Sequence, residues 1–323
     1  MVKKIVVEES LLKVQNTLGE GCVWDSRGQR LYFVDIEQNK VFTYEPSSGK
    51  RGYELFEKNI TALALLENGD GLIAAVEDGF AYIPFTHLPF PPTQSLQSLI
   101  PAQPTPSTQV VLTAGESRFN DGAVDPAGRF LAGTMGFKKG DVNSRMYSFQ
   151  VGEEGKYSAP LVLDKITCTN GMGWTDDNKS LYFTDSWIKT IKKFDYDLAT
   201  GKLSNPQIFS NVDTKELGFP DGMCMDTEGG VWSARFGAGK VLRFTPEGEI
   251  DVEIDFPSAW NMTCLIFGGE KLDELYITSA ASDLTDDQPD NIAERKDGGD
   301  LFVVKGLGFT GVERNRFKGA IPK

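Results

Sequence analysis

The sequence predicts an all-β protein, a six-bladed β-propeller formed by a single domain of residues 1–323. Short runs of β-branched and aromatic residues, bounded by Gly, Asn, Asp and Pro, are typical of strands and hairpins. Paired runs recur every 40 to 58 residues or so, about the length of a four-stranded propeller blade. No amphipathic helix pattern of useful length interrupts the series. A two-sheet sandwich would not explain a turn signature that recurs at this period.

Six units can be marked, each by two consecutive strand-like runs. The paired runs are 30–36 with 40–45, 71–76 with 79–83, 129–134 with 145–149, 180–185 with 190–195, 230–235 with 240–244, and 274–278 with 300–304. Two segments do not fit the pattern. Residues 87–109 are rich in Pro, Ser, Thr and Gln and are interpreted as a loop extension of the second unit. The acidic residues 281–299 split the sixth hairpin and form either a solvated loop or a lid with a second, weak cation site.

Composition restricts the partners and the chemistry. A net charge of −13 argues against a nucleic acid or an anionic membrane as a partner, and no apolar run is long enough to span a bilayer. The four cysteines include no C-x-x-C pair, which favours buried free thiols in a reducing, cytoplasmic setting over the alternative of paired disulfides. The single histidine, His87, argues against His-rich zinc sites and a Ser-His-Asp triad. We expect a cytoplasmic monomer or weak dimer that acts on a small molecule.

Four short stretches organise the chain, because each precedes the same turn signature. They are Leu18-Gly-Glu-Gly21, Arg118-Phe-Asn-Asp121, Thr169-Asn-Gly-Met172 and Pro220-Asp-Gly-Met223. In each, a polar residue lies five or six positions before the Asp that opens the turn: Glu20, Asn120, Asn170 or Asp221. Residues at equivalent positions of successive repeats occupy equivalent positions in the fold, so these side chains should meet at the channel mouth. The second unit has Thr61-Ala62 near this position, so the site should be built by units one, three, four and five.

Two carboxylates and two amide oxygens form a hard, oxygen-only ligand set. Such a set suits Ca²⁺, Mg²⁺ or Mn²⁺ and, with water at open positions, Zn²⁺ or Fe²⁺. The alternative is that Asn and Asp merely cap turns and strand ends. Four of these residues in one phase, with a Glu among them, favour a site for one divalent cation.

The same stretches hold candidates for catalysis. A divalent cation can polarise a substrate carbonyl, and a neighbouring carboxylate, Asp221 or Asp121, can take a proton from water. Asp121 is also a candidate substrate contact. Arg118 lies two residues before Asn120 on the same strand face, where it would hold substrate hydroxyls or a carboxylate. This combination predicts hydrolysis of a small polar ester.

Over nearly the whole chain, the motifs together resemble the SMP-30/gluconolactonase/regucalcin family. The resemblance rests on Leu18-Gly-Glu-Gly-Cys-Val-Trp-Asp25, Arg118-Phe-Asn-Asp-Gly122, Val124-Asp-Pro-Ala-Gly-Arg129, Gly133-Thr-Met135, Asn170-Gly-Met with Trp174, Tyr182-Phe-Thr-Asp185, Pro220-Asp-Gly-Met-Cys-Met-Asp226 and Phe267-Gly-Gly269. It implies a six-bladed propeller that hydrolyses sugar-acid lactones to aldonic acids. By the same resemblance, Glu20, Asn170 and Asp221 would bind a divalent metal, Asp221 would double as the general base, and Arg118 and Asn120 would hold the substrate.

The sequence departs from the family pattern at several positions. Gly136-Phe-Lys-Lys-Gly140 stands where an acidic substrate contact is expected, and Ala123 stands where a Lys is common. We hypothesise that Lys138 and Arg235 shift the preference toward lactones with a second carboxylate or another anionic group; the alternative is that both are ordinary exposed cations. Two other functions stay open. A regucalcin-like calcium-binding regulatory protein with little turnover would share the site, whereas a propeller scaffold for protein partners would leave the oxygen cluster unexplained.

Overall fold

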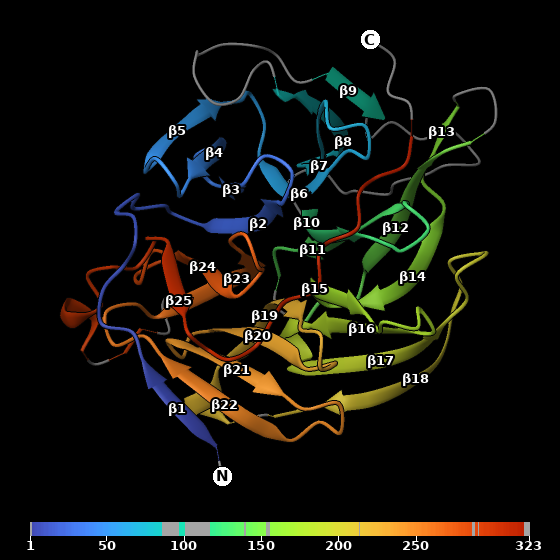
Figure 1. The fold of residues 1–323 in the computed structure, drawn as a ribbon. Coiled ribbons are helices and arrows are strands. Elements are labelled where there is room, and N and C mark those ends of the chain that lie inside the picture. Colours follow the sequence, from blue (N-terminus) through green and yellow to red (C-terminus); the bar gives the residue numbers. More distant parts are fainter. Residues whose placement is uncertain are drawn as a thin grey trace.

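Six small sheets form a ring in the computed structural model, which confirms the predicted six-bladed propeller (Figure 1). The structure describes residues 2–85, 117–138, 140–152, 156–212, 214–285, 288–289 and 291–319, and the backbone of 97–100. Among these residues, no helix is long and apolar enough to cross a bilayer.

Each blade is a meander of neighbouring strands that runs outward from the channel. Blades one to three consist of β2 (Gly19–Asp25), β3 (Arg30–Asp35), β4 (Lys40–Glu45) and β5 (Lys50–Leu55); β6 (Ile60–Leu65), β7 (Gly71–Val76), β8 (Gly79–Pro84) and β9 (Gln97–Ile100); and β10 (Ser117–Val124), β11 (Phe130–Gly136), β12 (Ser144–Val151), β13 (Tyr157–Ser158) and β14 (Leu161–Ile166).

Blades four to six follow the same plan. They consist of β15 (Thr169–Trp174), β16 (Ser180–Asp185), β17 (Thr190–Tyr196) and β18 (Leu203–Ser210); β19 (Phe219–Met225), β20 (Val231–Phe236), β21 (Lys240–Phe244) and β22 (Ile250–Asp255); and β23 (Asn261–Gly268), β24 (Glu274–Ala280) and β25 (Phe302–Lys305). Short 3-10 turns lie between strands: η3 (Ser186–Ile188), η4 (Lys215–Leu217) and η5 (Ile292–Glu294).

The hydrophobic core lies between neighbouring blades, where the faces of adjacent sheets meet. Between blades two and three, the rings of Phe80 and Phe149 stack with their centroids 4.7 Å apart, and Phe119 packs against Phe80 at 5.0 Å. All three side chains are fully buried. Because both faces of a blade are covered, the strands are apolar over most of their length instead of alternating strictly.

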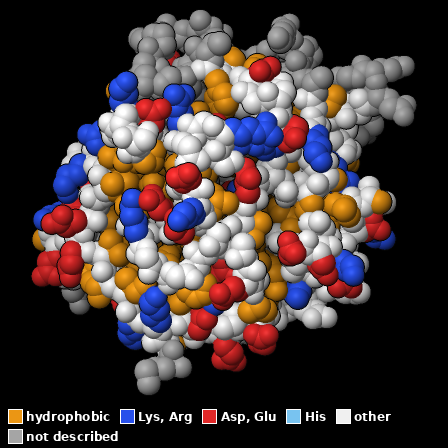
Figure 2. Space-filling view, in the orientation of Figure 1, with side chains coloured by type: hydrophobic (Ala, Val, Ile, Leu, Met, Phe, Trp, Pro, Cys, Tyr) orange, Lys and Arg blue, Asp and Glu red, His pale blue; other side chains and the backbone are white. Residues whose placement is uncertain are grey.

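Both ends of the described chain tie the ring together. Strand β1 (Lys3–Val6) pairs in parallel with β22 at the outer edge of blade five, and Leu12 then forms an antiparallel bridge with Leu301 of blade six. In Figure 1 the last described segment crosses the centre of the ring toward blade two. We call residues 310–318 the C-terminal strap. On this face, acidic and basic side chains are interspersed, with hydrophobic atoms between them (Figure 2).

The C-terminal strap contacts all six blades on the face opposite the predicted site; in blade six, the amide of Gly311 donates to the Leu272 carbonyl at 2.7 Å. Its Arg316 forms a buried ion pair with Asp25 of blade one at 2.7 Å, and the amide of Phe317 donates to the carbonyl of Leu65 in blade two. The side chain of Asn315 donates to the Val124 carbonyl of blade three. Arg314 donates to the carbonyls of Met172 and Met223, in blades four and five. The strap therefore closes one end of the channel with side-chain and backbone hydrogen bonds.

A β-bulge interrupts the innermost strand of each blade at the same place. The register with the next strand shifts after Glu20 in β2, Phe119 in β10, Thr169 in β15 and Pro220 in β19. A bulge leaves residues unpaired and turns their side chains out of the regular alternation. It therefore frees Asn120, Asn170 and Asp221 from the strand pairing and directs them toward the channel mouth.

Glycines at these bulges let adjacent inner strands approach closely. A Cβ on Gly171 would lie 2.3 Å from the backbone nitrogen of Met223 in the next blade, which no real structure tolerates. We expect Gly171→Ala to lower the free energy of unfolding by about 2 kcal/mol or more, because the clash is with backbone. A denaturant titration measures this. Gly152→Ala is the matched control, since its Cβ would meet only the Lys156 carbonyl at 3.6 Å; equal effects of the two changes would contradict the packing argument.

The Asp that opens each turn anchors the far end of its inner strand. The carboxylate of Asp226 accepts hydrogen bonds from Trp232 Nε1 and Arg243 Nε, both at 2.7 Å, and from the amide of Gly230 at 2.9 Å. Burial alone would raise the pKa of Asp226, but the hydrogen bonds from Arg243 and Trp232 outweigh it and lower this pKa below its ordinary value. The charged form is therefore the one that the fold stabilises.

This lowered pKa has a consequence for acid stability. A carboxyl whose pKa is lower in the folded state contributes stability above its unfolded pKa, of about 4, and loses it as the pH falls through the folded value. We expect the stability difference between the wild type and Asp226→Asn to be largest near neutral pH and to shrink below about pH 4. Urea unfolding at several pH values measures it, and a difference that is constant down to about pH 3 would contradict the assignment.

Candidate active site

The four polar side chains predicted from the repeat phase line one cleft at the channel mouth. The cleft has a volume of about 880 Å³, and Glu20, Asn120, Asn170 and Asp221 line it together with Arg118. They come from β2, β10, β15 and β19, the inner strands of blades one, three, four and five. Residues 61–62 of blade two do not line it. The four side chains thus share one cleft, as the repeat predicts, but Trp260, Leu284 and Thr285 of blade six line it too.

Two acceptor oxygens in this cleft are buried without a hydrogen-bond partner among the described residues. They are Oδ1 of Asn170 and Oδ1 of Asp221. The amide nitrogen of Asn170 donates to Ser186 Oγ at 2.8 Å, which turns its oxygen the other way. One oxygen of Glu20 accepts only the amide of its neighbour Gly21, at 3.0 Å. A buried acceptor without a donor is costly, and an oxygen-seeking cation would satisfy these three side chains at once.

Asn120 has a different role from Asn170 because its oxygen is engaged. Arg118 Nη1 donates to Asn120 Oδ1 at 2.6 Å and to the Phe119 carbonyl at 2.9 Å. The amide nitrogen of Asn120 donates to the Thr169 carbonyl of the next blade at 2.8 Å. Asn120 therefore orients the Arg118 guanidinium, and the oxygen donors left for a cation are Glu20, Asn170 and Asp221.

The electrostatics of the cleft favour a bound cation. Burial raises the pKa of Glu20 and of Asp221 well above the ordinary values; the Asp221 carboxylate adds to the effect on Glu20, and Asp121 adds to the effect on Asp221. Burial also lowers the pKa of the Arg118 guanidinium. A divalent cation bound near both carboxylates would offset the free-energy cost of burying their negative charges close together. Among the described residues, no group of three His, Cys, Asp or Glu side chains is placed to hold a metal ion, so a cation in this cleft would need an amide oxygen, such as that of Asn170, beside the carboxylates.

Two aspartates that position the site were not singled out as site residues from the sequence. Asp35, at the end of β3, accepts hydrogen bonds from the amides of Thr17 and Leu18, just before Glu20. Asp185, at the end of β16, accepts the amides of Thr167 and Cys168, just before Asn170. They share a sequence signal, because each closes the second strand of its blade after an aromatic pair. Both fix the loop that enters a bulged inner strand.

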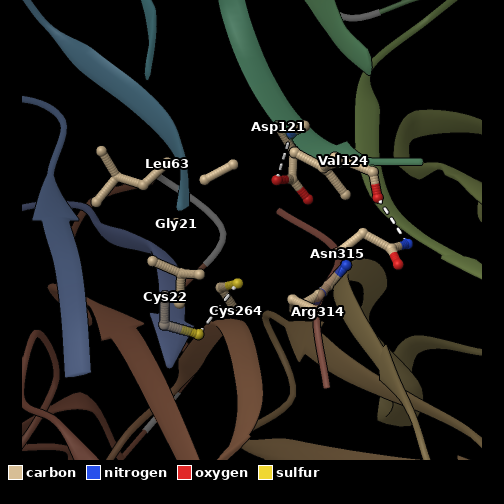
Figure 3. Close-up of a pocket in the computed structure, with 12 residues that line it drawn as sticks. Gly21, Cys22, Leu63, Asp121, Val124, Cys264, Arg314 and Asn315 are labelled. Atoms are coloured by element: carbon tan, nitrogen blue, oxygen red, sulfur yellow. Dashed lines mark hydrogen bonds between the residues drawn. The ribbon is translucent and has the colours of Figure 1, made fainter. Parts of the chain in front are cut away.

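Asp121 lies behind the cleft instead of in it. It is not among the residues that line the cleft; it lines a small cavity of about 20 Å³ deeper in the channel (Figure 3), room for about one water molecule. Its carboxylate accepts the Gly122 amide at 2.6 Å. The C-terminal strap closes the other side of this cavity with Arg314 and Asn315. Asp121 is therefore close enough to Asp221 for their charges to interact, but it does not line the cleft.

The structure does not place the two cations of the specificity hypothesis on the cleft wall. Lys138 is exposed and is not among the lining residues, although its neighbour Phe137 is. Arg235 is 1% exposed, and its Nε donates to the Leu217 carbonyl at 2.7 Å. Burial lowers the pKa of Arg235 to about 10, and the charge of Asp221 opposes the shift. Arg235 therefore lies behind the cleft, within electrostatic reach of Asp221.

The remaining expectations concern the cysteines and the insertions. All four cysteines are buried and free, as expected, and the sulfurs of Cys22 and Cys264 lie 3.3 Å apart in the cavity beneath the site. Leu284 and Thr285 of the acidic segment line the cleft, in agreement with a lid position for this part of 281–299. The segment 87–109, with His87, lies outside the residues for which side chains are described.

Fold and site together define a class: six-bladed propellers with oxygen donors at the channel mouth. Residues 18–281 match the SMP-30/Gluconolactonase/LRE-like region, and the chain belongs to this family. Regucalcin from Danio rerio is 32% identical over 313 residues, which cover 96% of this chain and 98% of that protein. The structure of a luciferin-regenerating enzyme is similar with a TM-score of 0.84 and 27% identity, covering 97% of this chain and 99% of the other. A calcium-binding regucalcin from Agrobacterium tumefaciens has a TM-score of 0.83 at 23% identity, covering 98% and 100%, and supports the fold alone.

Proposed function

We propose that the protein is a metal-dependent hydrolase that opens sugar-acid lactones, with Glu20, Asn170 and Asp221 as the ligands of one divalent cation. The observation that carries the proposal is the pair of unpartnered buried oxygens on Asn170 and Asp221, beside Glu20 in a single cleft. Membership of a family that includes gluconolactonases supports the substrate class. All donors are oxygens, which suits Ca²⁺, Mg²⁺ or Mn²⁺, and also Zn²⁺ or Fe²⁺ with water at the open positions.

The chain's own residues supply orientation and proton transfer. Bound between the three donors, the cation would polarise the lactone carbonyl. Asp221 takes the proton from the attacking water, because its carboxylate lines the cleft and its Oδ1 has no hydrogen-bond partner among the described residues. Arg118 holds hydroxyl or carboxylate oxygens of the substrate, and Asn120 keeps the guanidinium in place with the 2.6 Å hydrogen bond. The bond between the carbonyl carbon and the ring oxygen breaks, Asp221 gives its proton to that oxygen, and the open-chain hydroxy acid is the product.

A panel of sugar lactones tests the proposal against the regulatory alternative. The protein is stripped with a chelator, each of the five divalent cations is added back, and lactone opening is followed by proton release at constant pH. We expect turnover of at least one sugar lactone to return with a cation. Tight Ca²⁺ binding without turnover of any lactone would instead favour a regucalcin-like binding protein.

The preference for anionic lactones is a separate prediction. Lys138 and Arg235 are proposed to favour lactones with a second carboxylate, through their positive charge at the rim and behind the cleft. We expect Lys138→Glu to lower the kcat/KM ratio of carboxylated to neutral lactones by a few-fold, as a long-range charge effect allows. Equal turnover of both lactone types, unchanged in the variant, would remove the hypothesis. A cytoplasmic location and a monomeric or weakly dimeric state remain predictions.

A further inference from the structure

The cleft is larger and more aromatic than a monosaccharide lactone requires. Its volume of about 880 Å³ is in the upper part of the range of sites that enclose drug-sized ligands. One side, formed by blades four to six, carries the side chains of Trp187, Phe219, Phe236 and Trp260. We call these four residues the aromatic wall. All four are partly exposed; Lys189 lies over the Phe219 ring and Arg295 over the Trp260 ring, 4.9 and 5.1 Å from the ring centres.

Neighbouring elements of blades four to six hold the members of the aromatic wall in one cleft. Phe219 and Phe236 are direct partners in the pairing of β19 with β20, so their side chains share one face of blade five. The carbonyl of Trp260 accepts the amides of Ala238 and Gly239, which places this residue against the turn after Phe236.

At the other end of the wall, η3 joins Trp187 to the same surface. The Lys189 ammonium that follows η3 lies 4.9 Å from the centre of the Phe219 ring. The wall therefore extends from blade four across blade five to the start of blade six.

The wall begins next to the reacting group. Phe219 precedes Asp221 by two residues in β19, a distance of about 7 Å along an extended strand. A substituent attached to a lactone ring would thus reach the wall while the carbonyl remains at Glu20, Asn170 and Asp221. Aromatic faces of this kind bind flat apolar groups by stacking and by removal of apolar surface from water.

We propose that the physiological substrate is a lactone or ester with an aromatic or similar flat apolar substituent, which stacks on the aromatic wall. The proposal rests on the metal-dependent hydrolase function above, and it goes beyond sugar-acid lactones to substrates that carry such a ring. It predicts that affinity and turnover increase with a ring beyond the reacting group, instead of with the hydroxyl count of a sugar.

A matched pair of substrates tests the wall. We compare γ-phenyl-γ-butyrolactone with γ-butyrolactone in the metal-loaded full chain, since the two differ only by the phenyl group. We expect kcat/KM to be about tenfold to a hundredfold higher for the phenyl compound, the range expected for burial of a ring of this size. Phe236→Ala and Trp260→Ala should each lower this ratio several-fold. Tyr53→Ala, an exposed aromatic on β5 outside the cleft, should leave it unchanged.

A binding measurement tests the role of the aromatic wall independently of the proposed hydrolase activity. The corresponding lactams, with and without the phenyl group, resist hydrolysis, and calorimetry compares their affinities. Phe236→Leu, which keeps an apolar side chain but removes the ring, covers the case in which an alanine variant does not fold.

Each outcome decides one of the two proposals. The proposal for the aromatic wall is contradicted if lactones are hydrolysed without preference for the phenyl compound. It is also contradicted if the kcat/KM ratio of the phenyl to the unsubstituted lactone is unchanged in all wall variants. Both results are compatible with the hydrolase function. No turnover of either lactone, with phenyl-dependent lactam binding that weakens in the wall variants, overturns the hydrolase function and supports the wall.

Discussion

Replacing Asp221 with alanine is expected to reduce lactone hydrolysis at least a thousandfold. The substitution removes a proposed cation ligand together with the proposed general base, and general bases alone contribute about a hundredfold to ten-thousandfold. The variant should also lose most of its affinity for the divalent cation, because only Glu20 and Asn170 would remain as protein donors. Steady-state kinetics with saturating cation, and calorimetric titration with the same cation, measure the two effects.

Asp164→Ala is the charge-matched control for this change. Asp164 is an exposed carboxylate on β14 and does not line the cleft, so kinetics and cation affinity should match the wild type. Full activity of Asp221→Ala at saturating cation would contradict the proposed roles. Circular dichroism of the variant must match the wild type, because Asp221 lies at the bulge in the pairing of β19 with β20.

Replacing Arg316 with alanine is expected to cost about 3 to 5 kcal/mol of stability. Its guanidinium pairs with Asp25 at 2.7 Å, and the two side chains are only 5% and 8% exposed. Removing one member of a buried pair leaves the other charge buried without compensation, and here it also loosens the C-terminal strap over the channel. Urea unfolding followed by tryptophan fluorescence measures the loss.

An exposed ion pair of similar length provides the comparison. Lys58 and Asp78 lie 2.6 Å apart but are 43% and 38% exposed, so Lys58→Ala should cost less than about 1 kcal/mol. If Arg316→Ala were as mild as Lys58→Ala, the strap would not be held by its buried charge. Normal lactone turnover in a folded Arg316→Ala protein would separate the structural role of the strap from the chemistry of the cleft.

The fold was predictable because its signal is local and repeated. Strand composition and the turn opened by Asp25, Asp125 or Asp226 recur at equivalent positions of the repeats. In a ring of blades, residues at equivalent positions of the repeats lie at equivalent places around the channel. The meeting of Glu20 and Asp221 followed from the same argument. The separation of Asn120 from Asp121 did not, because the bulge that sends one residue into the cleft and its neighbour into the inner cavity depends on register between strands.

Features outside the repeat phase could not be predicted. The parallel pairing of β1 with blade five and the course of the C-terminal strap depend on contacts between residues hundreds of positions apart. The aromatic wall takes Trp187 and Trp260 from connecting segments, whose residue types are not repeated from blade to blade. Composition marks such residues as aromatic, but only the closed ring brings them to one side of the cleft.

The central claim is that Glu20, Asn170 and Asp221 hold one divalent cation on which lactone opening depends. The most direct measurement titrates the metal-free protein with the activating cation and follows bound metal and initial rate together. We expect no turnover without metal, a linear rise with bound cation, and a plateau at one cation per chain that Glu20→Gln abolishes. Full lactone turnover by the protein freed of metal would contradict the account.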